Sequence, residues 1–121
     1  MTSSPPFQWS VFEIDNDGTP GTGEGGSWPV LVVSRESANV VLPVVTVLPL
    51  TTRRTDRHVY PNEVLLRSGS AGLEIDSIAM AHQTRTIAKT WLEAPIGTLE
   101  DGDLRSAVRR AMCVQLNLEK G

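Results

Sequence analysis

Apolar residues gather in two runs near the middle of the chain, Pro29–Ser34 and Val40–Leu50, and a polar break at Arg35–Asn39 separates them. Both runs are rich in valine and leucine, and continuous apolar runs of this length are typical of strands that are buried on both faces. The polar break is long enough for one helical turn. The pattern therefore predicts two central strands joined by a short helical connection.

Shorter apolar segments before and after these runs extend the predicted sheet. They predict five further strands, at Trp9–Asp15, Pro61–Arg67, Asp76–Ala81, Gln83–Ala88 and Trp91–Ile96. His82 stands between two of these strands and breaks what is otherwise one extended segment. The small residues of Ser68–Gly72 predict a turn.

The period of the apolar residues becomes helical after Gly97. Apolar side chains then recur mainly three or four positions apart, at Leu104, Ala107, Val108, Ala111, Met112, Val114 and Leu118. This spacing predicts one amphipathic helix, roughly Asp103–Asn117, capped by Asp101 or Asp103. Many short strands followed by one terminal helix predict a mainly β fold of the α+β type, a small β-barrel covered by the C-terminal amphipathic helix.

The chain has 121 residues, of which 40% are hydrophobic and 21% charged, and these values predict one domain with its own core. We expect residues 1–8 to form a flexible arm and residues 9–121 to form that domain. The single cysteine, Cys113, excludes an internal disulfide and fits a reducing cytosol, so we expect a cytoplasmic protein. No apolar run approaches about 20 residues, so we expect no transmembrane helix.

The charge of the chain limits the ligands that it can bind. The formal net charge is −3, which argues against a protein that grips nucleic acid through its overall field. Arg53, Arg54 and Arg57 nevertheless form the densest basic stretch in the middle of the chain, directly after the hydroxyls of Thr51 and Thr52. An RNA ligand would have to use this local patch.

Five glycines and one proline mark the segment Asn16–Ser27, which we predict to be a mobile loop between strands. It contains a Gly-x-Gly pattern, but no predicted strand–helix unit surrounds it, so a dinucleotide site is not expected. No cluster of carboxylates and histidines suggests a metal-dependent nuclease, and we expect no metal and no cofactor.

Several short motifs follow one another from about Trp9 to Leu118. They are the glycine-rich loop with x-Pro-Val-Leu-Val-Val at Trp28–Val33, then Pro49-Leu50-Thr51-Thr52, Tyr60-Pro61 before Glu63-Val64, Gly72-Leu73, Asp76-Ser77, Gln83-x-Arg85-Thr86-Ile87 and Gly97-x-Leu99. In this order and spacing the chain resembles the MazF/PemK (Kid) family of toxins from type II toxin–antitoxin systems. The resemblance implies an SH3-like barrel, a homodimer, a sequence-specific and metal-independent endoribonuclease of single-stranded RNA, and a cognate antitoxin.

The resemblance also assigns roles to individual residues. The family threonine at the end of the Pro-Leu-Thr strand corresponds to Thr51, whose hydroxyl would bind the scissile phosphate. The family's acidic residue before the Gln-x-Arg-Thr motif corresponds to His82, whose imidazole can serve as acid or base near neutral pH. We therefore predict that Thr51 and His82 are catalytic. The residues predicted to contact RNA are Glu24, Trp28, Thr52, Arg53, Arg54, Gln83 and Arg85.

Two positions depart from the family pattern. The family's arginine before the strand proline corresponds to Trp28, and its loop glutamate is displaced, with Gly23 at that position and Glu24 after it. The arginine stabilises charge on the pentacoordinate phosphate, and loss of one such donor costs on the order of 10²–10³ in rate. Tryptophan has one N–H donor and no charge, so the charge would have to come from Arg53, Arg54 or Arg85.

The site residues also have structural interpretations. Trp28 either stacks on an unpaired base, at about 1–3 kcal/mol per base, or is a packing residue at the rim of the barrel or a dimer contact. His82 either shuttles protons or forms a hydrogen bond between strands, and Thr51 either binds phosphate or simply suits a strand end. Two functions follow: an endoribonuclease toxin, or a catalytically weak or inactive module that keeps the fold and the dimer and binds an antitoxin, RNA or another protein.

Overall fold

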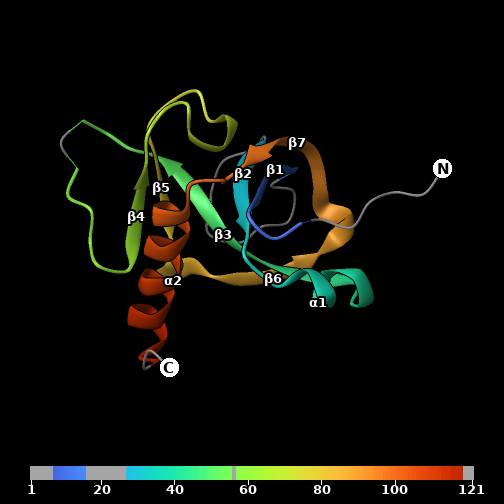
Figure 1. Cartoon of the computed structure of the whole chain (residues 1–121). Helices are drawn as coiled ribbons and strands as arrows, with labels where there is room; N and C mark the ends of the chain where they lie inside the picture. The colour runs from blue at the N-terminus through green and yellow to red at the C-terminus, as the bar shows by residue number, and fades with distance from the viewer. Residues whose placement is uncertain (1–6, 16–26, 56, 119–121) are drawn as a thin grey trace.

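The structure is a computed structural model that describes residues 7–15, 27–55 and 57–118. It contains seven strands and a long C-terminal helix (Figure 1). The strands are β1 (Ser10–Asp15), β2 (Ser27–Val32), β3 (Val44–Thr52), β4 (Glu63–Leu66), β5 (Ser77–Met80), β6 (Arg85–Ala88) and β7 (Leu92–Thr98). The helices are α1 (Glu36–Val41), α2 (Gly102–Leu116) and three 3₁₀ turns, η1 (Ser70–Gly72), η2 (Ala81–Gln83) and η3 (Lys89–Trp91).

The sheet is antiparallel and is organised around β3. Its order is β4-β5-β3-β2-β1-β7, and β6 pairs with the first half of β3, whereas β5 pairs with the second half. The turn η2, which carries His82, therefore lies against the middle of β3. This arrangement follows from the length of β3, because its nine residues can pair with two four-residue strands in succession.

The mainly β class with a C-terminal helix is confirmed, but the sheet is not closed into a barrel. Among the described residues no ladder joins β4 to β7, which are the two ends of the sheet. Helix α2 packs beside β4 and covers that end (Figure 1). The side chain of Asn62, just before β4, donates a hydrogen bond of 3.0 Å to Gln115 of the helix. The helix is therefore attached to the β4 end of the sheet.

Side chains from both faces of the sheet are buried. On one face Leu48 and Leu50 of β3 belong to a cluster with Val108 and Ala111 of α2. On the other face Val45 and Val47 belong to a cluster with Ile14, Val30, Val32 and Ile87. Burial on both faces is the reason that β2 and β3 have continuous apolar runs rather than an alternating pattern.

The second apolar run starts later as a strand than its composition predicts. Val40 and Val41 belong to α1, where they are exposed, and β3 begins only at Val44. Asn39 ties this helical turn to the end of the preceding run, because its side-chain amide donates to the carbonyl oxygen of Ser34 at 2.9 Å. The predicted helical turn is therefore correct, and the predicted start of the strand at Val40 is wrong.

Two motif glycines are required where η1 packs against β7. A Cβ atom at Gly72 would overlap the carbonyl oxygen of Ile96, and one at Gly97 would overlap the carbonyl oxygen of Ala71. Gly72 also has a φ of +79°, which suits glycine. The pairs Gly72-Leu73 and Gly97-x-Leu99 therefore mark one close backbone crossing, and both leucines are buried in the core.

Helix α2 begins and ends close to its predicted bounds. The carboxylate of Asp101 accepts hydrogen bonds from the N–H groups of Asp103 and Leu104, at 2.8 and 3.2 Å, which confirms one of the two predicted caps. The helix ends at Leu116, and the next residue, Asn117, caps it with a left-handed backbone. No helix in the described part of the chain is long and apolar enough to cross a membrane.

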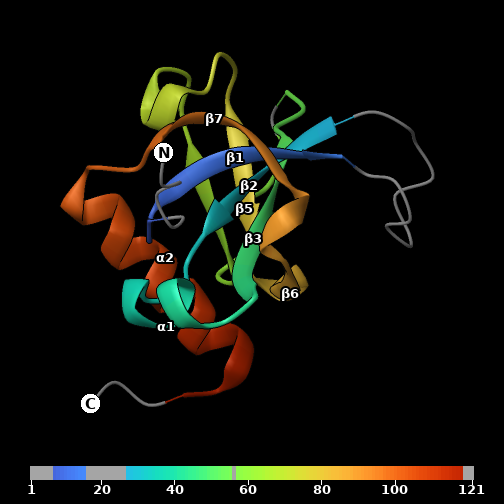
Figure 2. The same cartoon turned by 90° about the vertical axis from the view of Figure 1, so that its right-hand side faces the viewer.

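Trp9 joins the start of β1 to helix α2. Its φ of +79° is an outlier for a bulky residue, and the residue is 5% exposed. Its backbone N–H donates to Val32 at 2.7 Å, and its carbonyl oxygen accepts from Leu99 at 2.8 Å. The guanidinium carbons of Arg105 and Arg109 lie 5.5 and 5.0 Å from the centre of the ring. In Figure 2 the start of β1 lies beside α2.

Candidate functional site

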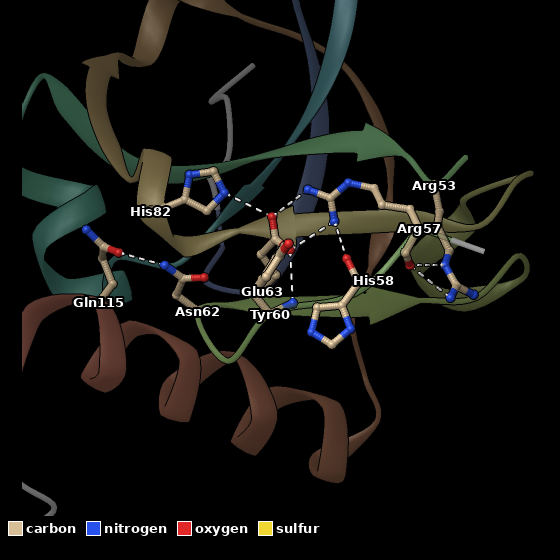
Figure 3. A network of polar contacts seen from close by, with 8 residues as sticks. All are labelled: Arg53, Arg57, His58, Tyr60, Asn62, Glu63, His82 and Gln115. Carbon is tan, nitrogen blue, oxygen red and sulfur yellow. Dashed lines mark hydrogen bonds and ion pairs between the residues drawn. The ribbon is translucent and has the colours of Figure 1, made fainter. Parts of the chain in front are cut away.

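The centre of the candidate site is the carboxylate of Glu63, the first residue of β4. Its neighbour Val64 points into the core, so Glu63 points to the opposite face of the sheet. The side chain is only 2% exposed. It accepts hydrogen bonds from the two terminal nitrogens of Arg57, at 2.9 and 2.8 Å, and from the backbone N–H of Tyr60 at 3.1 Å (Figure 3). This is a buried carboxylate with a bidentate arginine partner.

His82 completes this cluster from a different part of the chain. Its Nε2 atom lies 3.0 Å from Oε2 of Glu63, and about a third of its side chain is exposed (Figure 3). The turn η2 is held in place because the N–H of Ala81 donates to Asn62 at 3.1 Å. The hydroxyl of Thr84 donates to Ala81 at 2.6 Å. Fixed backbone on both sides of His82 therefore presents the imidazole to Glu63.

Arg57 keeps Glu63 ionised. Its hydrogen bonds are the largest cause of a pKa of about 2 for the Glu63 carboxyl, against an ordinary value of 4.5. Burial acts in the opposite direction, while the N–H of Tyr60 and the ring of His82 lower the pKa further. The same ion pair raises the pKa of Arg57. At neutral pH the cluster therefore contains a carboxylate and a guanidinium cation.

An open cavity of about 520 Å³ lies over this cluster. The polar lining comes from Arg57, Tyr60, Asn62, Glu63 and His82, and Pro61 and Val114 of α2 complete it. The ring of Tyr60 is exposed and meets the ring of His58 edge to face, with 4.5 Å between their centres. The cavity thus offers a guanidinium, an imidazole, an amide and an aromatic ring.

Thr51 projects from the same face of the sheet as Glu63. Thr51 pairs with Ile78, and Met80, two residues further along β5, pairs with Glu63. Directly paired residues and residues two apart share a face. At about 4.8 Å per strand and 3.3 Å per residue, the Cα atoms of Thr51 and Glu63 are about 12 Å apart. Thr51 is half-buried at the end of β3, and Thr52 is exposed.

The three arginines predicted to contact RNA do not all lie near the cluster. Arg53 is bound to the loop that presents Arg57, because its Nε and one terminal nitrogen donate to the Arg57 carbonyl oxygen at 3.2 and 3.1 Å. Arg54 is exposed beside it. Arg85 pairs with Val47, four residues before Thr51, and is half-buried. Arg53 and Arg54 thus lie close to the cluster, whereas Arg85 lies further along β3; Gln83 is exposed next to His82.

Trp28 packs against the second core cluster. It is half-buried, pairs with Ile14 of β1, and its indole nitrogen is buried with no hydrogen-bond partner among the described residues. Val30 pairs with Pro49 at one end of the β2–β3 ladder. Trp28 and Thr51 each lie two residues beyond that pair, so they stand opposite each other at that end of the ladder. The predicted RNA contact of Glu24 falls in residues 16–26, outside the described part of the chain.

Arg57 and Glu63 were not predicted as site residues, although the structure places them at its centre. Glu63 is a carboxylate in the otherwise apolar strand EVLL, and it belongs to the motif Tyr60-Pro61-x-Glu63-Val64. A charged residue in a buried strand requires a partner, which is the sequence feature that could have identified it. Arg57 stood out only as a member of the basic patch.

The fold and the site together define a small, mainly antiparallel β protein with a carboxylate-bound histidine and a strand-end threonine on one sheet face. A family model for the PemK-like, MazF-like toxins of type II toxin–antitoxin systems matches residues 7–116. The chain belongs to this family.

Similar proteins agree with this assignment. An endoribonuclease named MazF9 from Mycobacterium tuberculosis is 34% identical over 99 residues, which cover 78% of this chain and 82% of that protein. An endoribonuclease MazF from Staphylococcus saprophyticus subsp. saprophyticus is 27% identical over 108 residues, which cover 89% and 88%. A solved structure of an endoribonuclease in complex with its cognate antitoxin, from a mycobacterial species, has the same fold. Its TM-score is 0.76 at 22% identity, over 96% of this chain and 99% of that chain.

Proposed function

We propose that this protein is an endoribonuclease toxin that cleaves single-stranded RNA. Relatives across most of the chain are named endoribonucleases, so the alternative of an inactive binding module is not favoured. The observation that carries the proposal is the imidazole of His82, held 3.0 Å from a buried carboxylate on the sheet face that also presents Thr51. Single-stranded RNA suits such an open site because its bases can be splayed apart and stacked.

The proposed reaction uses the 2′-hydroxyl of the RNA as its nucleophile. The 2′-oxygen loses its proton and forms a bond to phosphorus, while the bond from phosphorus to the 5′-oxygen breaks and that oxygen gains a proton. The products end in a 2′,3′-cyclic phosphate and a 5′-hydroxyl. The hydroxyl of Thr51 would hydrogen-bond the scissile phosphate, and His82 would transfer one of the two protons, with water transferring the other.

Cations from other positions must stabilise the charge on the phosphate, because residue 28 is a tryptophan. Trp28 supplies no charge and packs on the core. Arg57 brings a guanidinium into the cavity of His82, and its side chain is 33% exposed although it is paired with Glu63. Arg53 and Arg54 continue this positive surface. We assign the electrostatic role to these three arginines and RNA guidance to Thr52, Gln83 and Arg85.

We also propose the partners and the setting of the toxin. One relative was solved in complex with its cognate antitoxin, and the shared fold supports a cognate antitoxin for this chain. We propose that it acts as a homodimer in the cytoplasm and that residues 9–121 form its one domain, with residues 1–8 as an arm.

The test is cleavage of mixed single-stranded RNA in EDTA by purified protein, with analysis of the RNA ends. We expect discrete fragments with cyclic-phosphate ends, and a loss of on the order of 10²-fold or more in the variants Thr51→Ala and His82→Gln. His58→Gln is the matched control, because it changes an exposed histidine of the same chain. A folded wild-type protein that leaves all RNA intact would overturn the proposal.

A further inference from the structure

The contacts of Glu63 determine which hydrogen-bonding role His82 plays. Oε1 accepts from Arg57 and from the backbone N–H of Tyr60, and Oε2 accepts from the other terminal nitrogen of Arg57. Three N–H donors and a nearly fully buried position are the environment of a carboxylate, which can only accept. The nitrogen of His82 that faces Oε2 must therefore carry the proton.

We propose that Glu63 is the positioning residue of His82: its carboxylate selects the Nε2–H tautomer and leaves Nδ1 as the nitrogen that exchanges a proton with RNA. This inference rests on the proposed function only where it names RNA as the molecule that exchanges a proton with Nδ1. The choice of tautomer is a property of the free protein. A neutral imidazole has one N–H and one lone pair, so a hydrogen bond that fixes one nitrogen also fixes the role of the other.

Among the described residues, His82 forms its side-chain hydrogen bond with Glu63 alone. The charged groups that line the cavity with it are Glu63 and Arg57, and α2 contributes the apolar side chain of Val114. In the described part of the chain, Glu63 is the ion-pair partner of both Arg57 and His82. One carboxylate therefore organises a cation and an imidazole in the same cavity.

Nitrogen-15 NMR of the imidazole tests the tautomer directly. His58→Gln leaves His82 as the single histidine, because the chain has two. At a pH where the ring is neutral, we expect the proton on Nε2 and the lone pair on Nδ1. In the additional variant Glu63→Gln we expect this preference to be lost. A proton on Nδ1 in the protein with Glu63, or an unchanged preference after Glu63→Gln, overturns the proposal.

The stability of the variants is controlled separately. Glu74→Gln removes an exposed carboxylate and should leave the ring signals unchanged. If Glu63→Gln fails to fold because Arg57 loses its carboxylate, the double variant Arg57→Gln, Glu63→Gln removes both charges and gives the same NMR test.

Kinetics provide the second readout. We expect Glu63→Gln to lower kcat by about 100-fold and to change KM little. Loss of a hydrogen-bond partner behind a metal ligand typically costs about 10–100-fold, and loss of the carboxylate of a catalytic triad costs about 10⁴-fold. Added to His82→Gln, it should cost far less than it does alone, because most of its effect acts through the imidazole that His82→Gln has already removed. Full additivity of the two losses overturns the proposal. If the wild-type protein cleaves no RNA, the proposed function fails, and the NMR result still decides the role of Glu63.

Discussion

Among the described residues, the carboxyl of Glu63 has the pKa that departs furthest from its ordinary value, because Arg57 pairs with it at both oxygens. Burial of a charged carboxylate costs free energy, and such a group is retained only where oppositely charged and hydrogen-bonding partners surround it. The residue thus connects two properties of the molecule, the stability of the start of β4 and the position of His82.

The stability of the fold should depend on the ionisation of Glu63. Its folded pKa of about 2 lies below the ordinary value of 4.5, so its contribution is complete above about pH 5 and is lost as the pH falls toward 2. We expect Glu63→Gln to lower the free energy of unfolding at pH 7 by about 1–3 kcal/mol, a range reduced because Arg57 is partly exposed to solvent. Urea unfolding of both proteins at pH 7, 5 and 3 should show this difference shrinking. A difference that stays constant would contradict the assignment.

Substitution of Trp28 should separate packing from catalysis. Trp28→Arg restores a cation beside Thr51, and we expect cleavage to become about 10²–10³ times faster. Because Trp28 packs on the second cluster, the free energy of unfolding should also fall, by about 1–3 kcal/mol. The control is Trp91→Arg, the same change at an exposed tryptophan, which should not raise the rate. An unchanged cleavage rate in Trp28→Arg would contradict this prediction and show that the native site already has the cations it needs.

At the scale of secondary-structure elements, the order of β5, η2 and β6 along β3 makes the site possible. Two short strands pair with one long strand, and the turn between them carries His82 across the middle of β3. A histidine in such a turn has backbone fixed on both sides while its ring remains partly exposed. This is the combination that a proton-transfer residue needs.

The crossing of η1 and β7 is the tightest backbone contact that glycines permit in the described sheet. We expect Gly97→Ala to lower the free energy of unfolding by about 1–3 kcal/mol, because its Cβ would overlap the backbone of Ala71. Gly102→Ala is the matched control, since no atom lies near its Cβ position and alanine favours a helix. Thermal unfolding measures both. Equal melting temperatures for the two variants would contradict the packing argument.

The sequence predicted the elements better than it predicted the site. Apolar runs and helical spacing give α2, β2 and most of β3 because burial on defined faces determines those patterns. The start of β3 was missed because Val40 and Val41 are exposed on a helical turn, which an apolar run does not reveal. The cluster of Arg57, Glu63 and His82 joins separate segments, and side-chain hydrogen bonds between distant residues leave no periodic pattern. The resemblance singled out Thr51 and His82, whereas the sheet face that Thr51 shares with Glu63 could be found only from the strand register.

At the scale of the whole molecule, positive charge is local rather than general. The net charge is −3, yet Arg53, Arg54 and Arg57 gather where β3 ends and the cavity begins. We therefore expect RNA to bind at this end of the sheet, because clustered arginines attract phosphates.

This local charge predicts the dependence of RNA binding on salt. We expect Arg54→Gln to weaken binding and to reduce the slope of log K against log salt by about 0.7, the value for one phosphate contact on a single strand. Arg35→Gln is the control, because Arg35 is exposed before α1, near the opposite end of β3. Binding titrations at several salt concentrations measure both slopes. Equal slopes in the two variants would place the RNA elsewhere.

The contact between Trp9 and helix α2 has a consequence for the synthesis of the protein. The first core cluster combines Trp9 and Val11 with Val108 and Ala111, so its two halves are almost a whole chain length apart. A nascent chain cannot bury this surface until the helix has left the ribosome. Ribosome-bound chains that end at Glu100 should therefore be digested rapidly by protease, whereas resistance in such chains would contradict the inference. A toxin built in this way can complete this core only after α2 has been synthesised.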